Sequence, residues 1–128
     1  MKSACQLFSA VRERLIEDPA LREILDKRVY FNLPERPAYP CVVFVVDEII
    51  DNNDTCRILF NLQLLFVHQK GCEPLKIGHM IQDVLEEGFS LSSSIYVACC
   101  KVKAIIDLPL GHKTHAIQHF YKALLWRN

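Results

Sequence analysis

The stretch RVYFNLPERPAYPCVVFVV (residues 28–46) decides the fold of this chain. It begins as the end of a helix, passes through a loop with three prolines, and closes in an unbroken apolar run over residues 41–46. The flanking prolines and the β-branched residues in this run favour a strand over a helix. Because apolar residues occupy both alternating faces, we expect this strand to be covered on both sides, within a covered sheet or by a second subunit.

Helices and strands alternate through the rest of the chain. Apolar residues at helical spacing predict an amphipathic helix before residue 17, and Asp18 followed by Pro19 predicts the start of a short second helix that ends near Lys27. A longer helix is predicted from Pro74 to a C-cap at Gly88, with a polar connection over residues 90–94. The predicted strands cover residues 41–50, 56–68, 95–106 and 114–126.

This order predicts an α+β fold in a single domain that spans residues 1–128. We expect a two-layer sandwich in α-β-β-α-β-β order, with a four-stranded, mostly antiparallel sheet and two main helices on one face. The opposite face of the sheet still carries Leu59, Leu65 and Val67. We therefore expect another protein chain to cover that face.

Charge and composition argue against several partners. The 15 Lys and Arg balance the 15 Asp and Glu, so the chain offers no basic field for nucleic acid and no polybasic signal for a membrane. No apolar run approaches the roughly 18–20 residues of a membrane span, and the N-terminus does not resemble a signal peptide. We interpret the six cysteines as reduced core residues of a cytoplasmic protein.

Five histidines raise the question of a metal site: His68, His79, His112, His115 and His119. On a strand, His115 and His119 share a face but lie about 13 Å apart, too far to bind one ion. We interpret the histidines as solvated or interface residues and expect no metal.

The thiols are also poor candidates for catalysis. A reactive thiolate needs a lowered pKa from a helix N-terminus or a cation, which the strand positions of Cys41, Cys99 and Cys100 do not offer by default. Cys72 is the best placed thiol, at the start of the long helix, but no partner histidine can be assigned to it. Phosphate-binding and hydrolase motifs are absent, so we expect no catalytic residue and no cofactor.

The residues alone leave two other classes of protein open. A small α+β sandwich fits a cytoplasmic ligand-binding or regulatory module, with His and Cys side chains around a pocket. It also fits an enzyme on a ferredoxin-like sheet, because a fold does not fix a function.

Residues 19–44 resemble the tail-completion, or tail-terminator, family of tailed bacteriophages, prophages and gene transfer agents. The resemblance rests on an RVY sequence at residues 28–30, a proline loop with Pro34, and a Tyr-Pro pair at Tyr39 and Pro40 before the strand. The final strand is similar in outline, with His115, Phe120 and Ala123 at matching positions.

The resemblance implies a structural virion protein that forms a ring, usually a hexamer, at the head-proximal end of the tail. Such a ring terminates the tail tube and joins it to the head connector, so the implied partners are copies of the chain, the tube protein and the connector. The implied location is the bacterial cytoplasm during assembly and then the phage-like particle. The expected interface residues are Phe31, Leu33, Tyr39, Leu59, Leu65 and Val67.

Overall fold

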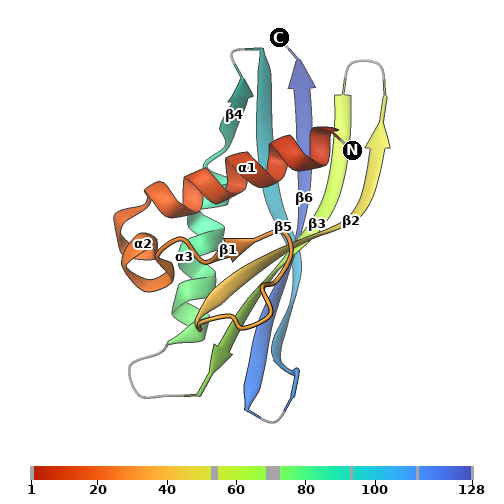
Figure 1. The fold of residues 1–128 in the computed structure, drawn as a ribbon. Helices are drawn as coiled ribbons and strands as arrows, with labels where there is room; N and C mark the ends of the chain where they lie inside the picture. Colours follow the sequence, from red (N-terminus) through yellow and green to blue (C-terminus); the bar gives the residue numbers. More distant parts are fainter. Residues whose placement is uncertain (1, 53–54, 69–72, 93, 112, 128) are drawn as a thin grey trace.

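The computed structural model describes residues 2–52, 55–68, 73–92, 94–111 and 113–127. They form a six-stranded mixed sheet that is strongly twisted, with three helices on one face (Figure 1). The helices are α1 (Lys2–Glu17), α2 (Pro19–Leu25) and α3 (Pro74–Glu86). The strands are β1 (Val29–Tyr30), β2 (Cys41–Asp51), β3 (Thr55–Val67), β4 (Phe89–Ser92), β5 (Ile95–Pro109) and β6 (Thr114–Arg127).

The predicted four-stranded sheet with two main helices is wrong. The strand order is β1-β2-β3-β6-β5-β4, in which β1 pairs with β2 in parallel and the other neighbours are antiparallel. The two-residue strand β1 is too short to show an alternating pattern. Strand β4 occupies most of the expected polar connection. The prediction missed it because serines favour turns in a sequence, whereas here they lie in a strand that pairs with β5. The short helix α2 completes a layer of three helices.

The helices begin and end where local chemistry favours it. The carboxylate of Asp18 accepts a hydrogen bond from the Leu21 N–H at 3.0 Å, and Pro19 takes the first position of α2. After α3, Gly88 adopts a φ of +81°, and the Tyr96 hydroxyl lies where a Cβ at this position would be. Only glycine fits this turn into β4.

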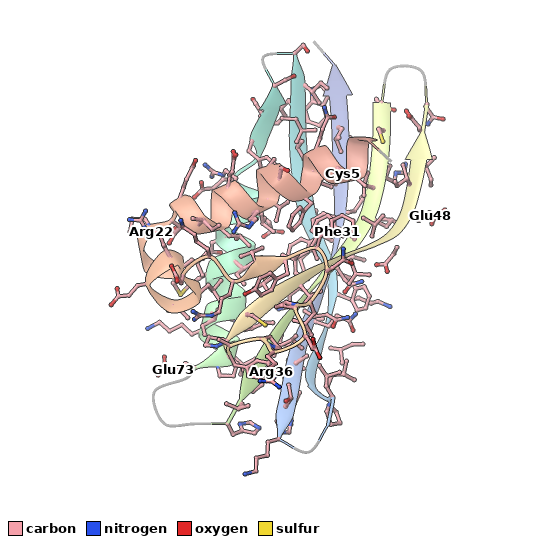
Figure 2. The ribbon with its side chains drawn as sticks, viewed as in Figure 1. Cys5, Arg22, Phe31, Arg36, Glu48 and Glu73 are labelled. Atoms are coloured by element: carbon pink, nitrogen blue, oxygen red, sulfur yellow. The ribbon has the colours of Figure 1, made fainter. Side chains whose placement is uncertain are left out.

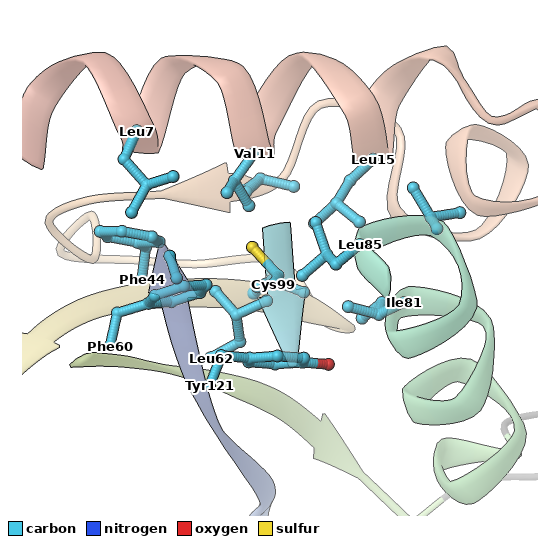
Figure 3. Packing of buried hydrophobic residues seen from close by; sticks show 14 of the residues in the cluster. Leu7, Val11, Leu15, Phe44, Phe60, Leu62, Ile81, Leu85, Cys99 and Tyr121 are labelled. Atoms are coloured by element: carbon cyan, nitrogen blue, oxygen red, sulfur yellow. The ribbon is translucent and has the colours of Figure 1, made fainter. Parts of the chain in front are cut away.

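A stack of aromatic rings lies at the centre of the main core. The Phe44 and Phe60 ring centroids are 4.9 Å apart, and the Phe60 and Tyr121 centroids are 5.3 Å apart, so the stack crosses β2, β3 and β6. Helix α1 covers the stack with Leu7 and Val11, and α3 closes its side (Figure 3). This layer of helices buries the inward-facing residues of the sheet.

Arg28 ties the ends of the proline loop together. Its Nε donates to the Pro40 carbonyl at 2.9 Å, and its Nη2 donates to the Ile24 carbonyl at 2.8 Å. The Arg28 carbonyl accepts from the Val42 N–H at 2.9 Å. These hydrogen bonds join the end of α2 to the start of β2, which explains why an arginine opens the RVY sequence.

The opposite face of β2 is covered by the same chain at its first residues. Cys41, Val43, Leu65 and Ala116 form a second buried cluster, against which Tyr39 of the proline loop packs. The two-sided apolar strand is thus covered on its outer face without a second subunit, at least near Cys41.

The helices are shorter than the strands they cover. Strands β3, β5 and β6 have 13, 15 and 14 residues, which corresponds to about 43–50 Å at 3.3 Å per residue. Helix α3, with 13 residues, spans only about 20 Å at 1.5 Å per residue. Helix α1 crosses the strands from β4 toward β2 instead of following them (Figure 1). The ends of the long strands therefore project beyond the helices (Figure 1).

Replacing Phe60 by Ala should remove the centre of the aromatic stack. Phe60 is fully buried, so we expect Phe60→Ala to lower the free energy of unfolding by about 3–5 kcal/mol. Leu75→Ala, at an exposed position of α3, should change it by less than about 0.5 kcal/mol. Urea denaturation followed by circular dichroism measures both, and equal effects of the two variants would contradict this description of the core.

Candidate assembly surface

Strand β5 forms a bare edge of the sheet over most of its length. Strand β4 pairs only with its first three residues, from Ile95 to Val97. The Glu86 carboxylate of α3 then accepts the Lys101 N–H at 3.2 Å, which covers the edge at that residue. Over residues 102–109, no other described strand lies beside β5 on this side (Figure 1). The open edge therefore coincides with the half of β5 that projects beyond the helices.

Large apolar side chains are exposed along this edge and in the residue that follows it. Val102 and Ile106 are each 62% exposed, and Ile105 and Leu110 are also exposed. We call Val102, Ile105, Ile106 and Leu110 the β5 strip. Several exposed apolar side chains along one open edge are typical of an interaction surface.

Two irregularities shape the edge beside the β5 strip. The pairing of β5 with β6 shifts register between Lys101 and Lys103, and again between Ile105 and Leu108. Bulges of this kind twist an edge strand and keep it from pairing with any passing strand. The β5 strip is thus suited to a specific contact through side chains rather than to open-ended sheet extension.

The opposite edge of the sheet also exposes apolar side chains. Strand β1 pairs only with Val42 and Val43, so the rest of β2 has no strand on that side among the described residues. Leu33 in the proline loop is 45% exposed, and Ile50 near the end of β2 is also exposed. Each side of the sheet therefore exposes apolar side chains, and the two sets of residues differ.

Only one of the three predicted loop residues projects freely from the protein. Leu33 is exposed, whereas the Phe31 ring packs edge-on against Phe8 at 5.2 Å and lies 5.8 Å from Phe44. Figure 2 shows Phe31 beneath α1, with Arg36 farther along the same loop. Tyr39 packs on the second buried cluster. Phe31 and Tyr39 therefore contribute to the fold whether or not they also meet a partner.

The three predicted sheet residues lie on the outer face and differ in exposure. Leu65 is only 3% exposed because the second buried cluster encloses it. Leu59 and Val67 are half-buried. None of the three lies at the open edge of β5, so sequence reasoning missed the β5 strip. Its signal was the high apolar content of residues 104–110, which only Asp107 interrupts.

Between these residues the outer face carries a buried polar network. The Asn61 side chain is 2% exposed, and its Nδ2 lies 3.1 Å and 3.0 Å from the two carboxylate oxygens of Asp47. Its Oδ1 accepts from Gln118 Nε2 at 2.9 Å. Because these groups are hydrogen-bonded to one another, the middle of this face is a satisfied polar surface and not an apolar docking face.

The buried thiols of Cys41 and Cys99 are poor nucleophiles. Burial raises the pKa of Cys41 to about 11 and that of Cys99 to about 12, against the pull of Arg28 at Cys41. A nucleophilic thiolate needs a shift in the opposite direction. Cys72 and His112 lie outside the described residues.

His119 is a packing residue in the core beneath α3. Its Nδ1 lies 3.3 Å from the Tyr121 hydroxyl, and its ring lies 3.2 Å from the position that a Cβ on Gly78 would take. Burial lowers its pKa to about 4, with smaller contributions from the charges of Lys101 and His79. The cavity beside it measures about 10 Å³, room for at most one water molecule.

One surface hollow among the described residues bears on the alternative of a ligand-binding module. It is an open groove of about 380 Å³ between α1 and β4. Its lining residues are Cys5, Gln6, Ser9, Ala10, Glu13, Ser90 and Leu91. Cys5 lines this groove but no histidine does, so it does not combine the His and Cys side chains expected of such a module. No described helix is long and apolar enough to cross a membrane.

The neutral state of His119 should make the fold sensitive to acid. Its pKa falls from the ordinary 6.5 to about 4 on folding, so the unfolded chain binds more protons between these values. Stability is then fully present above pH 6.5 and is lost as the pH falls toward 4, by up to about 3 kcal/mol. His119→Gln should remove this part of the pH dependence, whereas His79→Gln, at an exposed position, should keep most of it, because burial is the largest cause of the lowered pKa. Urea unfolding between pH 4 and 7 measures the difference, and an identical slope in wild type and His119→Gln would refute it.

Known proteins resemble the chain in sequence over one segment and in fold over almost its whole length. Residues 9–90 match the family described as tail completion protein gp17. No curated protein matches the sequence. A chain in the solved structure of the virion of a native gene transfer agent particle is similar in fold, with a TM-score of 0.79 and 16% sequence identity. That similarity covers 98% of this chain and 97% of the other.

Proposed function

Because the chain belongs to the tail completion protein gp17 family, we propose that it forms a ring that ends a phage-like tail. The family assignment confirms the predicted resemblance and makes the chain a structural tail protein, not an enzyme. The proposed ring, a hexamer of this single domain, lies at the head-proximal end of the tail tube and joins it to the head connector. It assembles in the bacterial cytoplasm before it becomes part of the particle.

The observation that carries the ring is the pair of unlike apolar edges. The β5 strip lies at one edge of the sheet, and Leu33 and Ile50 lie at the other. When one edge of a copy meets the opposite edge of the next, the contact is heterologous and repeats from copy to copy. The twist of the sheet rotates the two edges relative to each other, so successive copies turn instead of forming a flat ribbon. A rotation that closes gives a ring.

The two ends of the sheet supply the surfaces for the other proposed partners. The hairpin of β2 and β3 and the hairpin of β5 and β6 project beyond the helices at opposite ends of the sheet (Figure 1). In the proposed ring, one end contacts the tail tube and the other contacts the head connector. The fold shared with a chain of a gene transfer agent virion supports a place in such a particle.

Changing the β5 strip should block assembly without unfolding the chain. Ile106 is 62% exposed, so Ile106→Asp should shift the free energy of unfolding by less than about 0.5 kcal/mol. We expect this variant to leave tails that lack a terminator, seen by negative-stain microscopy as tails of irregular length without heads. Leu75→Asp, at an exposed site of α3, is the matched control. Normal particles with Ile106→Asp, or equal defects in both variants, would count against the β5 strip.

The proline loop allows the opposite edge to be tested. Leu33→Ser removes an exposed side chain and should impair assembly while the melting temperature stays unchanged. Phe31→Ser removes a ring that packs on Phe8 and Phe44, so it should also lower the melting temperature by several degrees. Particle yield and thermal melts measure the two effects. If Leu33→Ser assembled as well as wild type, this edge would not be part of the ring contact.

A further inference from the structure

Three strands bring potential metal ligands together at the uncovered end of the sheet. His68 directly follows β3, Asp107 lies near the end of β5, and His115 is the second residue of β6. The pairing of β3 with β6 sets Phe66 opposite His115, which brings His68 close to it. One ligand atom from each of the three side chains lies within 4.8 Å of the others.

The contacts inside this group leave a ring nitrogen without a hydrogen bond. Nδ1 of His115 lies 2.8 Å from Oδ1 of Asp107, an ion-pair distance. The two atoms are not aligned as a hydrogen bond, so this buried Nδ1 has no hydrogen-bond partner among the described residues. The His68 and His115 ring centroids are 4.3 Å apart with planes inclined at 58°. Nδ1 of His115 and Oδ1 of Asp107 are close enough to bind the same metal ion.

A bulge in β5 directs the carboxylate toward this group. Ile105 pairs with Gln118 and Leu108 pairs with Ala116, so two residues of β5 face one residue of β6. Asp107, the second of these two, has a φ of +61°, in the left-handed region that few non-glycine residues adopt. Bulges re-aim side chains, and backbone strain of this kind concentrates at functional sites.

We propose that His68, Asp107 and His115 bind one divalent transition-metal ion of the zinc type. Two imidazoles and a carboxylate suit such ions, whereas Mg²⁺ and Ca²⁺ require oxygen ligands. Ligand atoms about 2.0–2.2 Å from one ion lie about 3–4 Å apart. The three ligand atoms here lie within 4.8 Å of one another, so only a small movement of the side chains toward one another is needed. The Asp107 side chain is 61% exposed, so it has room for this movement. Water or a group from a neighbouring molecule completes the coordination.

A bound ion would join three strands where helices no longer hold them. It fixes the bulge next to Ile106 and so orders the β5 strip for its contact. This site goes beyond the proposed ring and does not depend on it, because a single chain supplies all three ligands.

Isothermal titration with Zn²⁺ tests the site on the purified full-length chain. We expect one site in the wild type, and His68→Ala, His115→Ala and Asp107→Asn should each weaken binding by at least about tenfold. Asp107→Asn keeps the side-chain volume and therefore the fold. His79→Ala and Cys100→Ser, both at exposed positions, should bind like wild type.

A second readout separates binding from folding. Zn²⁺ should raise the melting temperature of wild type and His79→Ala but not that of Asp107→Asn. Nitrogen signals of the His68 and His115 rings should shift on titration while those of His79 stay in place. Failure of the wild type to bind Zn²⁺, or loss of binding in Cys100→Ser or His79→Ala instead of the three ligand variants, would overturn the proposal.

Discussion

The structure depends on a mismatch in length between the sheet and its single layer of helices. Strands β3, β5 and β6 reach about 43–50 Å, whereas α3 reaches only about 20 Å along them and α1 crosses them. One face of the sheet receives the helices and the aromatic stack, and the proline loop covers the start of β2 on the other. Among the described residues, the far half of β5 with its apolar side chains remains uncovered, as does the β2 edge beyond Val43. A structural subunit whose neighbours complete it needs such a surface.

The buried thiols, histidine and polar side chains have structural roles, as expected of a structural protein. Burial holds Cys41 and Cys99 as thiols and His119 as a neutral ring. The Asn61 network satisfies its own hydrogen bonds on the outer face. The Arg28 side chain donates to a helix carbonyl and a loop carbonyl, and its own carbonyl accepts from the start of β2. Each of these groups holds the sheet in shape, which leaves the edges of the sheet and the projecting strand ends to carry the function.

The sequence predicted the long elements and the family because periodicity and the RVY and Tyr-Pro sequences are local signals. It missed β1 and β4 because short strands depend on the neighbour that pairs with them. It did not bring His68, Asp107 and His115 together, since their proximity depends on the β3–β6 register and on a bulge in β5. Distances along one strand, as used for His115 and His119, cannot reveal a contact across strands. The β5 strip was missed for a similar reason, because a bare edge is a property of strand order.

Hydrogen–deuterium exchange, compared between the isolated chain and the assembled particle, tests the central claim that the bare edge of β5 joins neighbouring copies. Within residues 102–108, the amides that face away from β6 should exchange quickly in the isolated chain and be clearly slowed in the particle, together with those around Leu33. Unchanged exchange at both edges, with new protection confined to α1 and α2, would contradict the account.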